Sequence, residues 1–480
     1  MVSQVDFLKK KTQSSNSMRR VLMVSLHFPP DTSAATHRVR LLAPHLPQYG
    51  WEPTVVTVSP DAYEGRLDPR LAALVPRSLA VVRCPAWPAR WTRMFGVGDL
   101  GLRAFWGVLR SCSRLLAREH FDALFITIMP VYAALLGPIL RRRHRIPFVL
   151  DYQDPWVGEW GKTAGPGSGG RPNWKSRASR ALGQLLEPLA VGSADALTAV
   201  SERTYAAVLE RNPEIHPFCT AIPIGCDGAD YMAANTNGAR NPYFDPDDGC
   251  CHLCYVGTLL PLGFETLRAV LRAVHMLREQ DPRAYARLRL HFFGTSNERS
   301  EHAAQRVLPV AREIGVDDCV SEVAARIDYL DALTVQKQAT AILMMGSSEP
   351  HYSASKLYPG LLARRPIVAV YHQASSVVET LRRVGRFPSV RCVSYDDRNR
   401  AESRVSQLFT ELRQLVHSPQ YCAEDIDMAA MQEFSACSLA GRLAGVLGSV
   451  AQSEARASLQ SSCETLPIAC TLTRPGNCGE

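Results

Sequence analysis

The stretch VLMVSLHFPPDTSAATHRVR, residues 21–40, indicates the fold class of this chain. It opens with a short apolar run, turns on two prolines, and enters a helical pattern through small residues that include Ser33 and Ala34. An abrupt change from strand to helix is typical of doubly wound α/β domains, which bind ligands beyond the carboxyl ends of their strands. Small residues would let a polar ligand approach the backbone, with Arg38 on the first helical turns. An ordinary strand-to-helix loop is the alternative.

The alternation of strand-like and helix-like segments continues along the chain. At 480 residues the chain exceeds what one hydrophobic core usually organises, and its 46% hydrophobic and 21% charged residues are ordinary for a globular protein. A helix is predicted at 264–280, and strands that are apolar on both faces indicate parallel sheets covered on both sides. The predicted strands are 21–26, 54–58, 79–83, 123–128, 147–150, 196–200, 252–256, 288–293, 341–345 and 366–370.

We therefore predict two doubly wound, Rossmann-like α/β domains that face a central cleft. The amino-terminal domain is expected at 19–235 and the carboxyl-terminal domain at 251–430, joined by a linker at 236–250 that is rich in Asn, Gly, Pro and Asp. A carboxyl-terminal helix is expected at 431–454. The two ends of the chain lack apolar periodicity and are expected to be disordered, at 1–18 and 455–480.

One uncharged segment, LFITIMPVYAALLGPIL at 124–140, has the composition of a short membrane span and is followed by RRRHR. Thr127, Pro130 and Pro138 interrupt it. A buried strand followed by a helix explains the segment better.

The fourteen cysteines have irregular spacing, and residues 1–18 lack the apolar run of a signal peptide, so reduced thiols in a cytoplasmic protein are expected. The cluster CCHLC contains Cys251, His252 and Cys254 but lacks a second ligand pair at a spacing suited to zinc. Cys254 is read as a small strand hydrophobe, with a metal site as the alternative. The acidic run at 245–248 falls in the linker, so no metal and no cofactor is expected.

The net charge of +8 is concentrated at residues 83–118, which carry seven arginines and one acid, Asp99, for a local charge of +6. The same segment contains Trp87, Trp91, Phe95, Phe105 and Trp106. Aromatic residues mixed with arginines suit an anionic membrane surface. A solvated basic face with a few core aromatics is the alternative.

Two acidic residues follow a predicted strand in FVLDYQDPW, namely Asp151 and Asp154. Carboxylates at a strand end suit sugar hydroxyls or a general base. Alternatively, Asp154 caps a turn and Trp156 fills the core.

In the second predicted domain, Gly257 and Thr258 close the first strand, where a turn before a helix could receive a phosphate. Farther on, Glu349 follows a strand in GSSEPHYSASKLYPG. The backbone amides of residues 353–355, together with the Lys356 ammonium at the start of a helix, would bind a diphosphate.

Together these segments resemble the family 4-type glycosyltransferases of the two-domain GT-B fold. The resemblance rests on residues 21–57, ADALTAVSE and IPIGCD in the first domain, and on YVGTL and SKLYPGLLARRPIVAV in the second. VLDYQDPW is similar to the Asp-x-Arg-Asp-Pro-Trp element of a bacterial subgroup. The resemblance covers about residues 20–385 and keeps their order.

The resemblance implies a retaining glycosyltransferase that moves a sugar from a nucleotide-sugar donor, held by the second domain, to an acceptor held by the first. The acceptor would be a glycan, a lipid-linked or a small molecule; neither a metal nor nucleic acid would be involved. The enzyme would be cytoplasmic or peripheral at the inner face of the membrane. The implied catalytic residues are Asp151, Asp154 and Lys356. The implied donor-binding residues are Ser33, Ala34, Arg38, Gly257, Thr258, Glu349, Ser353, Ser355, Lys356 and Leu357.

The sequence departs from the family pattern at three places. Ser-Ala-Ala replaces a glycine-rich loop, Thr258 and Leu262 replace a basic pair, and Pro359 replaces a glutamate that would bind ribose. Two alternatives therefore stay open: a catalytically weak GT-B homologue that serves as a binding or scaffold subunit, and a sugar-nucleotide epimerase.

Overall fold

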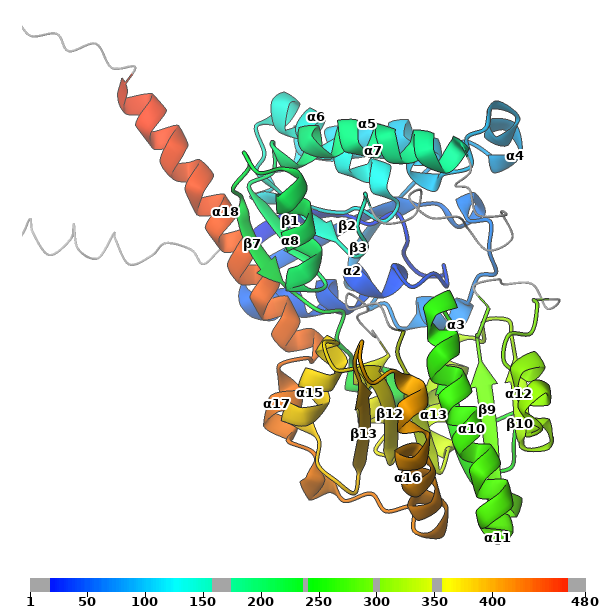
Figure 1. Ribbon diagram of the computed structural model, residues 1–480. Coiled ribbons are helices and arrows are strands. Elements are labelled where there is room, and N and C mark those ends of the chain that lie inside the picture. The colour runs from blue at the N-terminus through cyan, green and yellow to red at the C-terminus, as the bar shows by residue number, and fades with distance from the viewer. Residues whose placement is uncertain (1–17, 158–173, 236–240, 297–302, 348–355, 465–480) are drawn as a thin grey trace, which may run out of the picture.

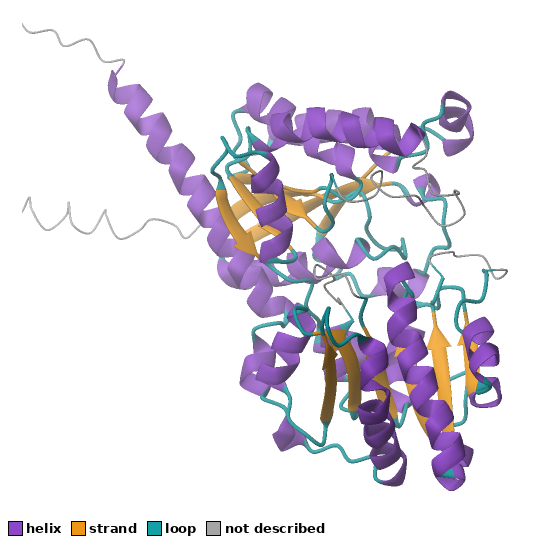
Figure 2. Cartoon of the chain, viewed as in Figure 1, coloured by secondary structure: helices purple, strands orange, loops and turns teal. Residues whose placement is uncertain are grey.

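The chain forms two α/β domains in the computed structural model, one above the other in Figure 1, which confirms the predicted fold class. The structure describes residues 18–157, 174–235, 241–296, 303–347 and 356–464. Each domain contains one parallel sheet with helices on both faces (Figure 2). Residues 1–17 of the predicted disordered segment 1–18, residues 236–240 of the predicted linker 236–250, and residues 465–480 of the predicted tail lie outside the described residues.

The amino-terminal sheet has seven parallel strands in the order β3-β2-β1-β4-β5-β6-β7. Six of them match the predicted strands within a few residues, and the edge strand β7 was not predicted. Their bounds are β1 Arg19–Val24, β2 Trp51–Val58, β3 Ala80–Cys84, β4 Ala123–Thr127, β5 Phe148–Tyr152, β6 Ala196–Ala199 and β7 Phe218–Ala221.

Alternating side chains of β1 supply two separate cores of this domain. Leu22 and Val24 pack on one face, in the core that includes residues of α5 and α6, whereas Val21 and Met23 pack on the other. The helical elements are α2 Thr36–Leu42, η1 Ala43–Tyr49, η2 Pro60–Ala62, α3 Pro69–Ala73, α4 Ala89–Thr92, η3 Arg93–Phe95, α5 Leu100–Arg118, η4 Val131–Leu135, α6 Leu136–His144, α7 Trp174–Val191 and α8 Glu202–Arg211.

The carboxyl-terminal sheet has six parallel strands in the order β10-β9-β8-β11-β12-β13. Sequence patterns predicted four of these strands and missed β10 and β13 at the two edges. The bounds are β8 Cys251–Val256, β9 Leu288–Phe293, β10 Val320–Val323, β11 Ala341–Met345, β12 Ile367–His372 and β13 Val390–Tyr395.

Helices cover both faces of this second sheet, and α10, Phe264–Gln280, has the predicted bounds. The remaining helical elements are α9 Gly228–Asn235, η5 Pro261–Gly263, α11 Pro282–Arg287, α12 Leu308–Ile314, η6 Asp317–Cys319, α13 Tyr329–Gln338, α14 Leu357–Leu362, α15 Ser376–Val384, η7 Ala401–Arg404, α16 Val405–His417, η8 Ala423–Asp425, α17 Met428–Gln432 and α18 Ala436–Glu464.

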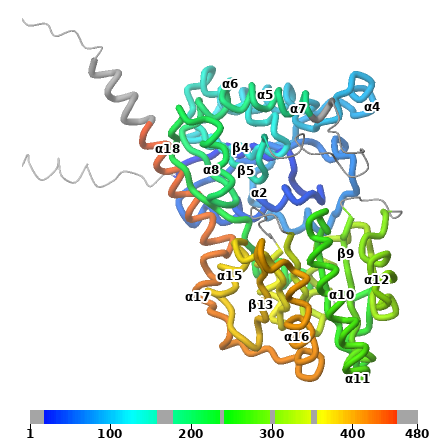
Figure 3. Tube along the Cα trace, viewed as in Figure 1, coloured from blue at the N-terminus to red at the C-terminus, as the bar shows by residue number. Residues whose placement is uncertain are grey.

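The last helix, α18, belongs to the amino-terminal domain although it ends the described chain (Figure 3). Leu439, Leu443 and Leu447 are fully buried in the same core as Val21 and Met23 of β1. Their spacing of four residues places them on one helical stripe. The helix extends to residue 464, so residues 455–464 are helical rather than part of the predicted tail.

The domain boundary also differs from the predicted one. Helix α9, which was assigned to the amino-terminal domain, packs through Tyr231 and Ala234 into a core of the carboxyl-terminal domain. The Tyr231 hydroxyl donates a hydrogen bond of 2.7 Å to the Pro359 carbonyl oxygen. The chain therefore leaves the first domain before Gly228.

The uncharged segment 124–140 forms the buried strand β4 and then η4 and α6, as predicted. Among the described residues, no helix has the combination of length and apolar character that crossing a membrane requires.

A pair of buried histidines fixes the linker to the second sheet. His252 Nδ1 and His291 Nε2 lie 2.9 Å apart, Asp248 bonds His252 at 2.9 Å, and the Phe244 ring stacks on both imidazoles. Cys254 is fully buried in β8, and burial raises the pKa of its thiol. No cluster of ligands suited to a metal ion occurs among the described residues.

Acid is expected to destabilise the carboxyl-terminal domain through His291. Burial, followed by the neighbouring His252, lowers the pKa of His291 to about 4. Between about pH 6.5 and 4 the unfolded chain therefore binds more protons than the native state. The free energy of unfolding decreases as the pH is lowered through that window. The full shift corresponds to about 3 kcal/mol. Urea unfolding at pH 7.5 and 5 should show a smaller loss for His291→Asn than for the wild type; equal losses would exclude His291 as the cause.

Candidate active site

The predicted cleft falls where the two domains contact each other, beyond the carboxyl ends of β1 and β8. Each sheet reverses its strand order next to these strands, between β1 and β4 and between β8 and β11, which is where ligands of doubly wound sheets bind. Contacts between the domains line the cleft: the His37 ring of α2 lies 4.4 Å from the Tyr329 ring of α13.

Two predicted donor residues from different segments meet on the carboxyl-terminal side of the cleft. Gly257 follows β8 directly, and a Cβ atom at this position would lie 3.5 Å from Cδ of Lys356. Thr258 is half-buried, and its carbonyl oxygen accepts a hydrogen bond from the Tyr255 hydroxyl at 3.1 Å. Leu357 is buried. Gly257, Lys356 and Leu357 line a cavity of about 20 Å³, enough for one water molecule.

The Lys356 ammonium lies in a cationic environment. Its side chain reaches solvent, yet the protein around the ammonium desolvates it and lowers its pKa to about 8, and the Arg326 guanidinium contributes in the same direction. The pKa of His37 is lowered well below its usual value by burial first, and then by Arg40 and Lys356. Lys356 and Arg326, both of the carboxyl-terminal domain, therefore supply positive charge near the His37 ring, as a site for an anionic ligand requires.

Sequence reasoning missed His37 and Arg326. His37 directly precedes Arg38, and its ring, unlike the Arg38 side chain, faces the other domain. Arg326 lies just beyond β10, the edge strand that was not predicted, and a Cβ atom on Gly294 would lie 3.8 Å from its Cα. The signal for Arg326 would have been a basic residue at a strand end.

On the amino-terminal side, Ser33 and Ala34 lie in the loop before α2, and Ala34 is exposed. The Ser33 hydroxyl donates a 2.5 Å hydrogen bond to the buried Asp31 carboxylate, which also accepts one from Thr36 at 3.1 Å and contacts His27 Nδ1 at 2.7 Å. Asp31 thereby fixes the loop that approaches the cleft.

Arg38 and Asp151 do not reach the cleft, contrary to the prediction. They form a two-bond ion pair of 2.9 and 2.6 Å in which the arginine is 1% exposed and the aspartate 0%. Asp151 lies inside β5 and also accepts a hydrogen bond from Thr198 on β6, while Arg38 also donates to the Ile222 carbonyl oxygen. With these bonds made, the pair holds α2 against the strands and has a positioning role.

Asp154 lies outside β5 and is exposed, unlike Asp151. The protein around its carboxyl group desolvates it and raises its pKa. Trp156 is buried in the amino-terminal core, as the alternative reading proposed. The predicted donor residues Glu349, Ser353 and Ser355 lie outside the described residues.

Exposed ion pairs join the domains beside the cleft. Arg70 of α3 bonds Asp331 of α13 at 2.8 Å and Asp328 at 2.9 Å, and Arg66 bonds Asp328 at 3.0 Å. A more buried pair, Arg40 with Asp230, lies nearby. Sequence reasoning missed all of them because their partners are far apart in the chain.

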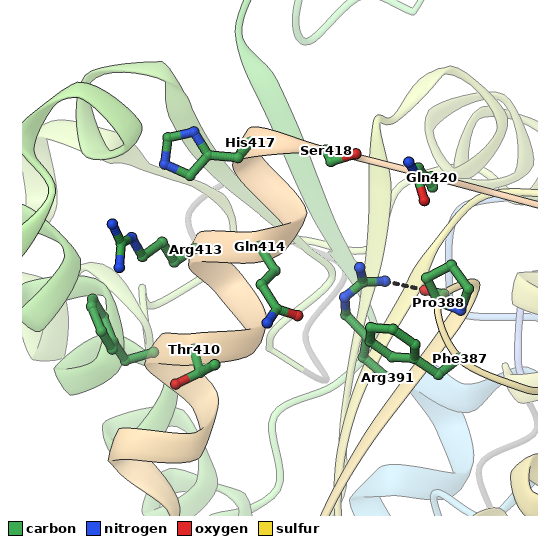
Figure 4. Close-up of a pocket in the computed structure, with 10 residues that line it drawn as sticks. Phe387, Pro388, Arg391, Thr410, Arg413, Gln414, His417, Ser418 and Gln420 are labelled. Atoms are coloured by element: carbon green, nitrogen blue, oxygen red, sulfur yellow. Dashed lines mark hydrogen bonds between the residues drawn. The ribbon is translucent and has the colours of Figure 1, made fainter.

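A larger cavity lies elsewhere, at the far end of the carboxyl-terminal domain. It has a volume of about 770 Å³ between α16 and the turn before β13 (Figure 4). Phe387, Arg391 and Gln414 line it, and the Arg391 guanidinium bonds the Pro388 carbonyl oxygen. This cavity adjoins the amino end of β13 and contains no predicted site residue, so it is not the candidate active site.

Comparison with known proteins agrees with this architecture. Residues 33–220 match the profile of the glycosyl transferase 4-like domain. No curated protein sequence matches the chain significantly.

Several solved structures are similar over nearly the whole chain, at low sequence identity. HepE from Anabaena, solved in complex with UDP and glucose, has a TM-score of 0.53 and 13% identity over 90% of this chain and 100% of its own. A UDP-forming trehalose-phosphate synthase from Burkholderia xenovorans has a TM-score of 0.56 and 13% identity, covering 90% and 99%. A glycosyltransferase from Rickettsia africae has 0.54 and 12%, covering 90% and 98%.

The two-domain architecture is shared with these structures and is that of the GT-B fold. The match to the glycosyl transferase 4-like domain covers most of the amino-terminal domain and does not extend into the carboxyl-terminal domain.

Proposed function

We propose that the protein transfers a hexose, with retention of anomeric configuration, from a uridine diphosphate sugar to an acceptor bound by the amino-terminal domain. The choice of donor is supported by the similar structures, since HepE was solved with UDP-glucose and the trehalose-phosphate synthase is UDP-forming. The glycan, lipid-linked or small-molecule class of acceptor is proposed from the sequence resemblance.

The observation that carries the proposal is the cationic environment beside Gly257 and Thr258. Lys356 and Arg326 belong to the carboxyl-terminal domain, and the His37 ring of the amino-terminal domain faces them. The departing diphosphate gains negative charge as the sugar bond breaks, and prepositioned cations stabilise that charge. Arg326 would replace part of the positive charge that Thr258 and Leu262 lack.

Retention is proposed to follow from attack on the same face of the sugar as the departing diphosphate. In this mechanism a phosphate oxygen of the leaving group accepts the proton of the acceptor hydroxyl. Asp154, exposed and beyond β5, would orient a sugar or acceptor hydroxyl through a hydrogen bond. Asp151 would act indirectly, by holding α2 and its His37 in place.

The proposal requires that the purified protein release UDP from UDP-hexoses, with faster release when an acceptor is present. We expect chelator to leave this turnover largely intact, because Lys356 and Arg326 would supply the positive charge that a metal ion supplies elsewhere. A coupled assay for UDP, with and without EDTA, measures both. Complete loss of activity that magnesium restores would overturn the metal-independent mechanism.

The same assay distinguishes the alternatives. A binding or scaffold subunit would bind UDP in calorimetry without releasing it from any donor of the panel. An epimerase would convert the sugar of the donor, which chromatography of the remaining nucleotide detects.

We further propose that the enzyme acts in polysaccharide or glycolipid assembly at the cytoplasmic face of a membrane.

A further inference from the structure

The outer surface of the amino-terminal domain exposes a group of large apolar side chains. They lie on the segment after β3, on α4 and η3, and on the first two turns of α5, at one end of the helical layer above the sheet (Figure 1). Their exposed fractions range from 40% for Leu102 to 84% for Phe95. We call them the aromatic patch: Trp87, Trp91, Met94, Phe95, Leu102 and Trp106. Soluble proteins seldom expose such a group without an interaction partner.

The base of the aromatic patch is fixed rather than loose. Arg103, one of the seven arginines of the basic segment, is buried and donates hydrogen bonds of 3.0 Å to the carbonyl oxygens of Trp87 and Ala62. The Trp87 backbone N–H donates to the Arg103 carbonyl oxygen. A Cβ atom at Gly107 would lie 2.2 Å from the Pro85 carbonyl oxygen, so α5 packs closely against this segment. The fold therefore holds the tryptophans outward.

Exposed positive charge borders the aromatic patch. On α5, Arg110, Arg114 and Arg118 continue the stripe of Leu102 and Trp106 at intervals of four residues, and all three are exposed. Arg90 and Arg93 lie among the aromatic residues, and Arg93 pairs with Glu64 at 2.9 Å. The one acid of the segment, Asp99, caps α5 by accepting a hydrogen bond from the Leu102 N–H. An apolar centre with a cationic border matches an anionic lipid surface.

The apolar surface extends beyond the segment that the sequence singled out. Helix α7 packs beside α6 and η4 in the same layer as α5, and it exposes Leu182, Leu185 and Leu189 at helical spacing. Ile139 of α6 is also exposed. Helices α5 and α7, which belong to one layer, thus both expose apolar side chains to solvent.

We propose that the aromatic patch docks the protein on a bilayer that contains anionic phospholipids. The tryptophan and phenylalanine rings enter the boundary between headgroups and acyl chains, and the exposed arginines contact lipid phosphates. Docking goes beyond the transfer reaction; only its use for a lipid-linked acceptor rests on the proposed function.

The test is co-sedimentation of the full chain with vesicles of phosphatidylcholine alone or mixed in equal parts with phosphatidylglycerol. We expect binding to the anionic vesicles, weakened at least tenfold by salt above physiological strength. Trp91→Ser with Phe95→Ser should lower binding at least tenfold. The matched control, Phe218→Ser with Met232→Ser, removes two apolar side chains that are also more than half exposed but lie elsewhere, and it should bind as the wild type does.

Thermal melts of both double variants exclude misfolding as the cause, and Arg110→Glu with Arg114→Glu provides a second route to the same loss. Absence of binding to either vesicle, or equal binding to both at every salt concentration, would overturn the proposal. So would a dimer in solution that Trp91→Ser with Phe95→Ser dissociates, because the patch would then bind a second copy. None of these measurements requires donor turnover. A negative result would therefore overturn docking without bearing on the proposed transfer reaction.

Discussion

Lys356→Ala is expected to lower turnover a hundredfold to a thousandfold while leaving the melting temperature nearly unchanged. Removing one group that stabilises the charge of a leaving diphosphate costs on the order of 3 to 4 kcal/mol in the transition state. We expect a loss of turnover near the upper end of what removing one such group costs. The reason is that Thr258 and Leu262 carry no charge and Pro359 has no carboxylate for ribose, so fewer groups share the task. Stability should persist because the Lys356 side chain reaches solvent.

Steady-state kinetics and thermal melts measure the two parts of this expectation. Lys337→Ala, at the last turn of α13 in the same domain, is the matched control and should keep normal turnover. Because the pKa of Lys356 is lowered to about 8, kcat/KM should fall as the pH rises above 8, and Lys356→Arg should move that fall upward. Normal kinetics in Lys356→Ala would remove the assigned donor site and favour a non-catalytic protein.

Arg38→Ala is expected to destabilise the amino-terminal domain by about 3 to 5 kcal/mol, the usual cost of leaving one partner of a buried ion pair without the other. The change leaves the Asp151 carboxylate in the interior with the Thr198 hydroxyl as its one remaining side-chain partner among the described residues. It also removes the hydrogen bonds that Arg38 donates to the carbonyl oxygens of Ile222 and Pro223. The loss is measured as the change in the free energy of unfolding of the amino-terminal domain in urea.

A double variant separates this structural role from a catalytic one. Arg38→Met with Asp151→Leu replaces the ion pair by apolar groups of similar volume and should recover much of the stability. If Arg38 and Asp151 instead contacted substrate, Arg38→Ala would fold with normal stability and lose only turnover. That result would contradict the positioning role.

The sequence predicted the central strands of both sheets and the edge strand β3, but it missed the other three edge strands. Strands such as β1 and β4 are fully buried over most of their length, so their apolar runs are unmistakable. β7, β10 and β13 are edge strands with half-exposed positions, which weakens the apolar signal. Helix positions on α10 were predictable because its apolar residues repeat at helical spacing over many turns.

The candidate site was predictable only in part, because residue type does not reveal which partner a charged group finds. Arg38 and Asp151 were chosen as ligand contacts, yet they pair with each other across 113 positions of sequence. Gly257 and Lys356 do lie together, since both follow strands at the point where the sheet reverses its order. Arg326 was missed together with the edge strand that positions it.

The path of α18 has a consequence for the synthesis of the protein. Leu439, Leu443 and Leu447 complete the core beneath β1, the first strand of the described residues, but they are made only after the whole carboxyl-terminal domain. Until then, one apolar face of the first sheet lacks the part of its cover that α18 supplies and is open to chaperones or to aggregation. The second domain can finish folding first, which reverses the usual order in which domains mature.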